Sequence, residues 1–219
     1  MQTLKTSKAK ENILSKVRKA LSQDKLPMPF PDVEKEDALE AFAKSELSIE
    51  EQFAENFTKL GGKFIFCGNN EELFENLHLL YDDRGWQKVF CSEEALNNNF
   101  RSHKLNFIQS THIEDGSADA CITGCEFAVA RTGSVIISSK QHMGRTSTVF
   151  YPVHIIIVLG NQVVADIQDG IDSLKNKYGN NLPSMINLNT GPSRTADIEK
   201  TLVVGVHGPG EVFCFFVNT

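Results

Sequence analysis

Short apolar runs alternate with polar segments along most of this chain, and the alternation is that of a protein built from strands and helices. The run VHIIIVLG (153–160) is rich in β-branched residues, which favour strands. Its neighbour SVIISS (134–139) has the same character. We predict buried strands at these runs and at residues 63–67, 88–92, 106–110, 118–124, 184–190 and 212–218.

Helical spacing of apolar residues fills several gaps between these strands. Residues 71–80 predict a short helix, Ser92 is placed to cap another, and residues 161–178 give the clearest helical stripe, ended by Gly179. Short buried strands that alternate with helices are typical of a largely parallel sheet covered on both faces. The fold class predicted is therefore α/β.

The first sixty residues have a different pattern. Ile13, Leu14, Val17 and Leu21 share one helical face, and a second helical stripe at residues 49–60 ends at a pair of glycines. A charged connection with a proline-rich start lies between them. We expect an N-terminal helical extension over residues 1–60 and an α/β domain over residues 61–219.

Composition limits the partners. The 219 residues are 41% hydrophobic and carry a formal net charge of −6, which argues against nucleic acid or an anionic membrane surface but permits a small anionic ligand. No signal-like or membrane-spanning apolar stretch is present, so we expect a cytoplasmic protein. The five cysteines fit reduced core thiols, and the C-x3-C of Cys121 and Cys125 lacks the further ligands that a metal site needs.

The loop NTGPSRTADIE (189–199) offers the most plausible anion cradle. Ligands of open α/β sheets bind beyond the carboxyl ends of the strands, and this loop follows a predicted strand. Gly191 permits a tight turn, Ser193 supplies a hydroxyl, and Thr195 would cap a short helix whose free N–H groups face the loop mouth. The guanidinium of Arg194 suits a carboxylate or phosphate.

A purely structural turn explains the same residues. In that interpretation Arg194 pairs with Asp197 or Glu199. The turn HGPGE (207–211) leads into the final strand and is expected to pack beside the loop as a neighbouring wall.

Three side chains are candidates for proton or nucleophilic chemistry. Glu126 follows a predicted strand, and His142 and His207 lie in polar loops. Each also has an ordinary structural interpretation, as an exposed carboxylate or as an imidazole that ties down a turn. The chain has no G-x-S-x-G, Walker or dinucleotide-binding signature, and no cofactor site is identifiable.

The stretches ITGCEFAVARTGSVIISS, GRTSTVFYPVHIIIV and TGPSRTADIEKTLVVGVHGPGE resemble the lactate-utilisation protein C family, whose shared module is the LUD domain. The resemblance is clear from about Ala118 to the C-terminus. It implies a Rossmann-like domain of the sugar-phosphate isomerase and CoA-transferase type. Carried over by position, the family motifs fall on Thr132, Gly133, Arg145, Gly191, Ser193, Arg194, Thr195, Asp197, His207, Gly208 and Gly210.

Two motif positions depart from the family. Serine replaces the second threonine of the T-G-T turn at Ser134, and the residue before that turn also differs. Many members have an acidic residue before the T-G-T turn, and this chain has Arg131 there. The change inverts the local charge. We expect Arg131 to add a third guanidinium to a site with Arg145 and Arg194, which would favour an organic acid or a phosphorylated ligand.

The resemblance also implies a role in a three-protein system that oxidises L-lactate to pyruvate, in which the partner subunits carry the iron–sulfur clusters. We predict a subunit without a cluster that binds a small organic acid or assists those partners. Whether it catalyses a step itself is left open, because lactate oxidation requires an electron carrier. The alternatives are a phosphate-ester or acyl-CoA-handling enzyme, with Glu126 as the nucleophile, and a purely structural subunit.

Overall fold

The computed structural model describes residues 7–22, 45–109, 118–141, 147–196 and 202–218. The chain groups into two compact units, residues 1–44 and 45–219. In the first unit the described element is the amphipathic helix α1 (Ser7–Leu21), whose apolar side chains are exposed. In the second unit α2 (Ile49–Lys59) buries Phe53 and Phe57. The expected boundary between an N-terminal extension and the α/β domain, after residue 60, stays a prediction. In the structure α2 belongs to the second compact unit.

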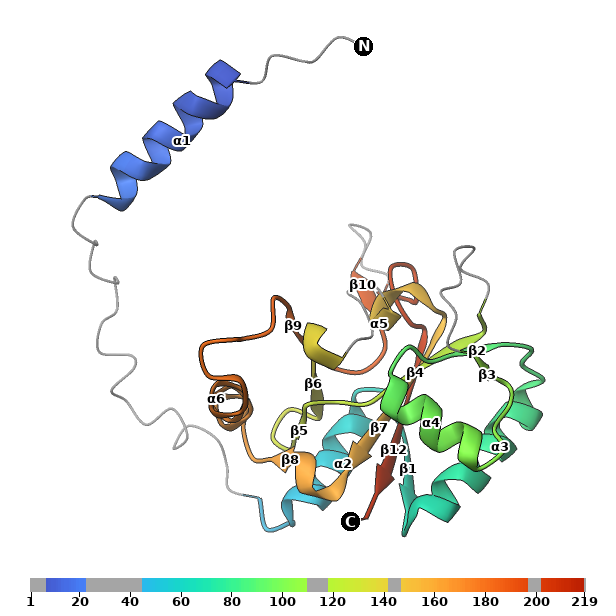
Figure 1. Ribbon diagram of the computed structural model, residues 1–219. Helices are drawn as coiled ribbons and strands as arrows, with labels where there is room; N and C mark the ends of the chain where they lie inside the picture. Colours follow the sequence, from blue (N-terminus) through green and yellow to red (C-terminus); the bar gives the residue numbers. More distant parts are fainter. Residues whose placement is uncertain (1–6, 23–44, 110–117, 142–146, 197–201, 219) are drawn as a thin grey trace, which may run out of the picture. The chain divides into compact units, whose positions relative to one another are not determined.

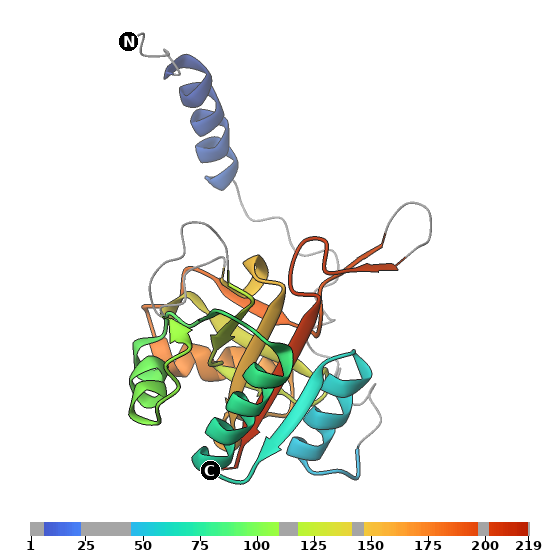
Figure 2. The same ribbon diagram turned by 90° about the vertical axis from the view of Figure 1, so that its right-hand side faces the viewer.

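A six-stranded sheet forms the centre of the second unit (Figures 1 and 2). Its strand order is β1-β12-β7-β4-β2-β3, and every neighbouring pair is parallel. The predicted α/β fold with a mostly parallel sheet is therefore confirmed. The strands are β1 (Lys63–Cys67), β2 (Val89–Phe90), β3 (Ile108–Gln109), β4 (Ala120–Thr123), β7 (Val153–Leu159) and β12 (Glu211–Val217).

One face of this sheet is covered by α3 (Asn70–Arg84) and α4 (Glu94–Ser102). Asn69 caps α3 with its side chain, but the N-cap of α4 is Glu93, which makes no capping bond. The predicted cap at Ser92 is wrong by one residue. The core between these helices and the sheet includes Leu73, Leu77, Phe100, Ile122, Ile155 and Phe215.

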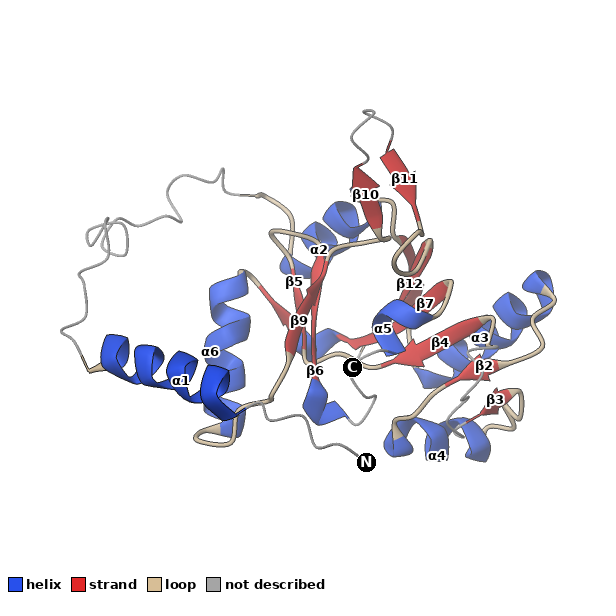
Figure 3. Cartoon of the chain, turned by 90° about the horizontal axis from the view of Figure 1, so that it is seen from above, coloured by secondary structure: helices blue, strands red, loops and turns tan. Residues whose placement is uncertain are grey.

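A second sheet packs against the opposite face. Its order is β8-β5-β6-β9, formed by β5 (Phe127–Val129), β6 (Ser134–Ser138), β8 (Val163–Val164) and β9 (Ile186–Asn189). The apolar side chains of β5 and β6 meet those of α2, β7 and β12 in a shared cluster. On its far side the second sheet is covered by α6 (Ile167–Tyr178), as Figure 3 shows from above.

The helix expected over residues 161–178 is thus shorter than predicted. The 3₁₀ turn η3 (Gly160–Gln162) comes first, and Val163 and Val164 then pair with β5 as β8. The helix begins only after Asp166, where a capping box with Asp169 starts it. Pairing with a strand more than thirty residues away has overridden the local helical pattern.

Several short elements complete the unit, and α5 (Ser147–Phe150) lies near the amino end of β7. The α5 turn directly precedes β7, after the 3₁₀ turn η2 (Ser139–Gln141) that follows β6. The antiparallel pair β10 (Arg194–Ala196) and β11 (Leu202–Val204) forms a hairpin that projects from the sheets (Figure 2). Thr195 therefore lies in a strand, and the expectation that it caps a helix from Ala196 is wrong.

Candidate functional site

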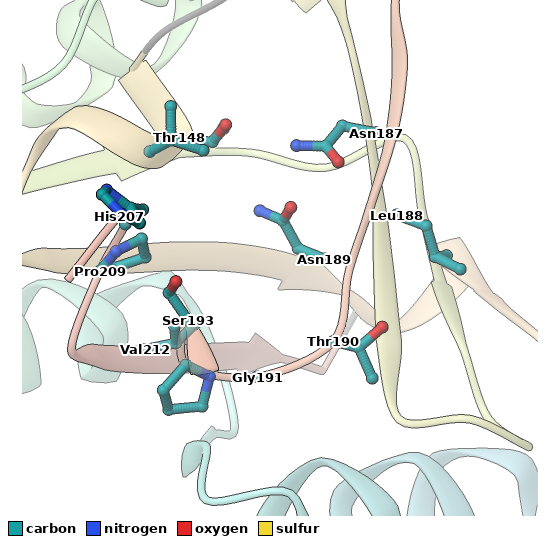
Figure 4. A pocket seen from close by; sticks show the side chains of 13 residues that line it. Thr148, Asn187, Leu188, Asn189, Thr190, Gly191, Ser193, His207, Pro209 and Val212 are labelled. Carbon is teal, nitrogen blue, oxygen red and sulfur yellow. The ribbon is translucent and has the colours of Figure 1, made fainter. Parts of the chain in front are cut away.

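The GPSR and HGPG turns line one cavity. Its volume is about 260 Å³, and its walls come from α5, β9 and the two turns. We call it the turn pocket. It is formed by Thr148, Val149, Asn187, Leu188, Asn189, Thr190, Gly191, Pro192, Ser193, His207, Gly208, Pro209 and Val212 (Figure 4).

Backbone hydrogen bonds hold the two turns together. The Ser193 N–H donates to the Pro209 carbonyl over 2.9 Å, and the Gly205 N–H donates to the Ser193 carbonyl over 3.0 Å. A Cβ at Gly208 would lie 2.9 Å from the Cβ of Ser193, so a side chain there would push the turns apart. The Gly210 N–H fastens the second turn to Pro152 over 2.9 Å.

The pocket lies at the amino ends of β7 and β12, opposite to the edge that we expected. Val212 is the second residue of β12, and Thr148 and Val149 lie just before β7. The carboxyl-end rule applies to loops of the parallel sheet. The loop that contributes Gly191 and Ser193 instead follows β9, which belongs to the second sheet, so the rule does not fix its position.

Amide and hydroxyl groups dominate the polar lining. Asn187 and Asn189 project from β9 into the cavity, toward the side on which Thr148 and His207 lie (Figure 4). Among the described lining residues His207 is the only titratable side chain. The sequence argument missed the two asparagines, although I-N-L-N places both on one face of a strand. They alternate with the exposed Ile186 and Leu188.

Two of the three expected arginines lie outside this lining. Arg194 is exposed on β10, and its guanidinium donates to the Leu60 carbonyl. Arg131 forms a two-pronged ion pair with Asp166, including a 3.0 Å bond, and the pairing lowers the pKa of Asp166. Arg145 lies outside the described residues, as do His142 and Asp197. A cluster of guanidinium groups therefore stays a prediction.

The T-G-S turn (residues 132–134) contacts the pocket wall through Ser134 and Thr190. Thr132 and Gly133 do not line it, but the Ser134 hydroxyl lies 2.9 Å from that of Thr190, which does. Gly133 packs against the backbone of α2, which also binds this turn through the Asn56 amide. These contacts give the turn a structural role, and its expected ligand contacts stay predictions.

Glu126 lies apart from the turn pocket and is 2% exposed. Its carboxylate accepts hydrogen bonds from Lys177, Ser138 and Tyr178. Burial alone would raise the pKa of Glu126, but these donors outweigh it and hold the pKa below its ordinary value. The surroundings do not favour Glu126 as a nucleophile, because its oxygens are engaged inside the fold.

A second carboxyl group, missed in the sequence, has the opposite electrostatics. Glu93 accepts the Gly124 N–H over 2.7 Å at the carboxyl ends of β2 and β4. Burial raises its pKa from 4.5 to about 7, the Gly124 N–H counteracts this, and the charge of Glu126 adds to it. Glu93 lines an open hollow of about 510 Å³ with Glu94, Ala95, Asn98 and Gln141.

No group of three or more histidine, cysteine, aspartate or glutamate side chains among the described residues is arranged to hold a metal ion. No helix in the described part of the chain is long and apolar enough to cross a membrane. The five cysteines, all within the described part of the chain, are buried and form no disulfide bond.

Comparison with known proteins identifies the family. The model of the LUD domain family matches residues 50–217, and the chain therefore belongs to this family. One solved structure has a similar fold. A DUF162 family protein of Deinococcus radiodurans, known from a crystal structure, aligns with a TM-score of 0.58 over 80% of this chain and 99% of its own, at 20% identity.

Several relatives have the name lactate utilization protein C, which confirms the resemblance seen in the sequence. That of Bacillus velezensis is 37% identical over 103 residues, 46% of this chain and 43% of the relative. That of Deinococcus radiodurans is 34% identical over 45% of this chain and 46% of the relative. That of Geobacillus sp. is 31% identical over 57% of each. The matched segments thus span about half the length of these relatives.

Proposed function

We propose that this protein takes part in lactate utilization as a subunit without an iron–sulfur cluster, and that its turn pocket binds a small organic acid. The main support for ligand binding is that both family turns, GPSR and HGPG, meet around one small polar cavity. The names of the relatives support the metabolic assignment. The iron–sulfur subunits would be its partners and would supply the electron transfer that lactate oxidation needs.

The size and lining of the pocket suit such a ligand. A volume of about 260 Å³ is below the range typical of drug-sized ligands and fits a molecule of a few carbon atoms. Asn189, Ser193 and the backbone of the turns offer hydrogen bonds to an acid. Among the described residues, His207 in the pocket wall is the candidate for a proton acceptor. Arg194 and Arg145 as carboxylate ligands belong to this proposal, and Arg194 would have to leave Leu60 to serve.

A thermal-shift comparison tests the proposal. Wild type is heated with L-lactate, pyruvate, sugar phosphates and CoA esters, beside Asn189→Ala and the exposed control Asn180→Ala. A ligand at a hundredfold excess over its Kd stabilises by about 2.7 kcal/mol, which for a protein of this size raises the Tm by about 5–10 °C. We expect a shift with lactate or pyruvate that Asn180→Ala keeps and Asn189→Ala loses.

Other outcomes contradict the proposal in different ways. A shift only with CoA esters or sugar phosphates would favour the phosphate-ester or acyl-CoA-handling alternative. An unchanged response in Asn189→Ala would move the site away from the turn pocket. No shift with any compound would reject the ligand, and copurification with the iron–sulfur subunits would then test the structural role.

A further inference from the structure

The hydroxyl of Thr148 is buried in the wall of the turn pocket. The residue is 3% exposed, and its Oγ1 has no hydrogen-bond partner among the described residues. Buried hydroxyls in native proteins are almost always hydrogen-bonded, since losing water without a replacement costs free energy. Thr148 is also part of the pocket wall. An unsatisfied group at this place is therefore suited to an atom that enters the pocket.

The groups around Thr148 define what that atom can be. Figure 4 shows the Thr148 oxygen pointing toward the side of the cavity from which Asn187 and Asn189 project. Neither asparagine side-chain amide makes a hydrogen bond to another described residue, and both line the cavity. No carboxylate, ammonium or guanidinium group is among the described lining residues. Neutral dipoles of this kind suit a neutral oxygen better than a charged one.

Hydroxyl and amide groups can recognise both the oxygen of an alcohol and the oxygen of the corresponding ketone. The Thr148 hydroxyl can accept a hydrogen bond from an alcohol or donate one to a ketone. An asparagine carboxamide can do the same through its oxygen and its nitrogen. The same wall can therefore hold an alcohol and the ketone derived from it, without moving a charged side chain.

The opposite wall of the pocket is formed by the turns, with the Ser193 hydroxyl at the lower side of the view in Figure 4. Val149, next to Thr148 in α5, and Val212 add apolar surface to the lining. A ligand with a carboxylate at the turns, a short carbon chain and a neutral oxygen on the adjacent carbon would match the three parts of this lining.

We propose that Thr148, together with Asn187 and Asn189, binds the oxygen on the carbon next to the carboxylate, so that the turn pocket selects 2-hydroxy and 2-oxo acids over acids without that oxygen. This inference rests on the proposed function, because it requires the pocket to bind an organic acid. It goes further in naming the specificity-determining residue. It involves no covalent or redox step in this chain.

The test compares three acids of the same carbon skeleton. Isothermal titration calorimetry of the full chain is carried out with L-lactate, pyruvate and propionate, which lacks the second oxygen. The variants are Thr148→Val, which keeps the shape and removes the hydroxyl, and Thr148→Ser, which keeps the hydroxyl. Thr58→Val is the matched control, because the Thr58 hydroxyl donates to the Ala54 carbonyl within α2, away from the pocket lining.

We expect wild type, Thr148→Ser and Thr58→Val to bind lactate and pyruvate about tenfold more tightly than propionate, the effect of one hydrogen bond. In Thr148→Val the affinity for lactate and pyruvate should fall about tenfold, while that for propionate stays within twofold. The Tm of Thr148→Val without ligand should equal or exceed that of wild type, because an unpaired hydroxyl is removed.

Contrary results separate the two proposals. If wild type binds all three acids equally, as when Thr148 holds only a water molecule, the inference is overturned and the proposed function stands. The inference also fails if Thr148→Val keeps its preference, loses propionate affinity to the same extent, or melts several degrees lower. If wild type binds none of the acids, the proposed function fails and the inference fails with it.

Discussion

Glu93→Gln should stabilise this protein in alkaline solution and leave it unchanged in mild acid. The Glu93 carboxylate lies at the start of α4 and accepts the Gly124 N–H over 2.7 Å. Burial raises its pKa from 4.5 to about 7, and the nearby charge of Glu126 contributes in the same direction. Glutamine keeps the accepting oxygen and cannot ionise, so the variant removes the charge alone.

The sign follows from proton binding. Between pH 4.5 and about 7 the folded protein holds a proton on Glu93 that the unfolded chain has lost. The Glu93 contribution therefore makes the free energy of unfolding decrease as pH rises through this range, and level off above it. The difference between the two pKa values corresponds to about 3 kcal/mol at most.

Urea unfolding at pH 5 and pH 8, at constant ionic strength, measures this effect. Glu93→Gln should exceed wild type by about 2–3 kcal/mol at pH 8 and by much less at pH 5. Other titrating groups, such as Glu126 and His154, are present in both proteins, so their contributions largely cancel in the difference. Glu94→Gln, at the exposed neighbouring position, is the matched control for removing a glutamate charge near the start of α4.

Two results would refute this reasoning. An equal difference between variant and wild type at both pH values would mean that Glu93 has the same pKa in the folded and unfolded chain. A variant less stable than wild type at pH 8 would mean that the ionised carboxylate is stabilising where it lies. Either result would remove Glu93 as a group that exchanges protons near neutral pH.

The remaining predictions concern packing and charge. Gly133→Ala should cost at least about 3 kcal/mol in urea unfolding, because its Cβ would lie 2.4 Å from backbone of α2; Gly85→Ala, with a similar positive φ in open space, should cost about 1 kcal/mol. Glu126→Gln should cost about 1–3 kcal/mol at pH 7, a loss that shrinks as pH falls through the lowered pKa of Glu126; a constant loss would contradict the assignment. Burial lowers the pKa of His154 to about 3, so wild type should lose stability as pH falls below 6.5, and acid titration of His154→Leu should show a shallower slope.

The candidate site was only partly readable from the sequence. The glycine and proline content of residues 190–194 and 207–211 marked both turns, since those residues signal tight backbone geometry wherever they cluster. The unpaired state of the Thr148 hydroxyl was not readable, because a threonine in a polar segment gives no indication of burial. The same holds for Glu93, whose raised pKa comes from desolvation in the folded unit.

The amino-acid sequence alone predicts the longer strands of both sheets. The runs that became β6, β7 and β12 are apolar and β-branched or aromatic, and such composition marks a buried strand regardless of its partners. The run that became β1 has the same composition, but it forms an edge of its sheet and leaves Phe66 exposed, so the expected burial there is wrong. The tertiary structure sets which short segments pair as strands and which side chains reach a distant hydrogen-bond partner. Val163 and Val164 became a strand only through β5, and Arg194 bonds a carbonyl 134 residues earlier in the chain. Local patterns record burial and turn geometry, but a contact between distant residues depends on how the whole chain packs.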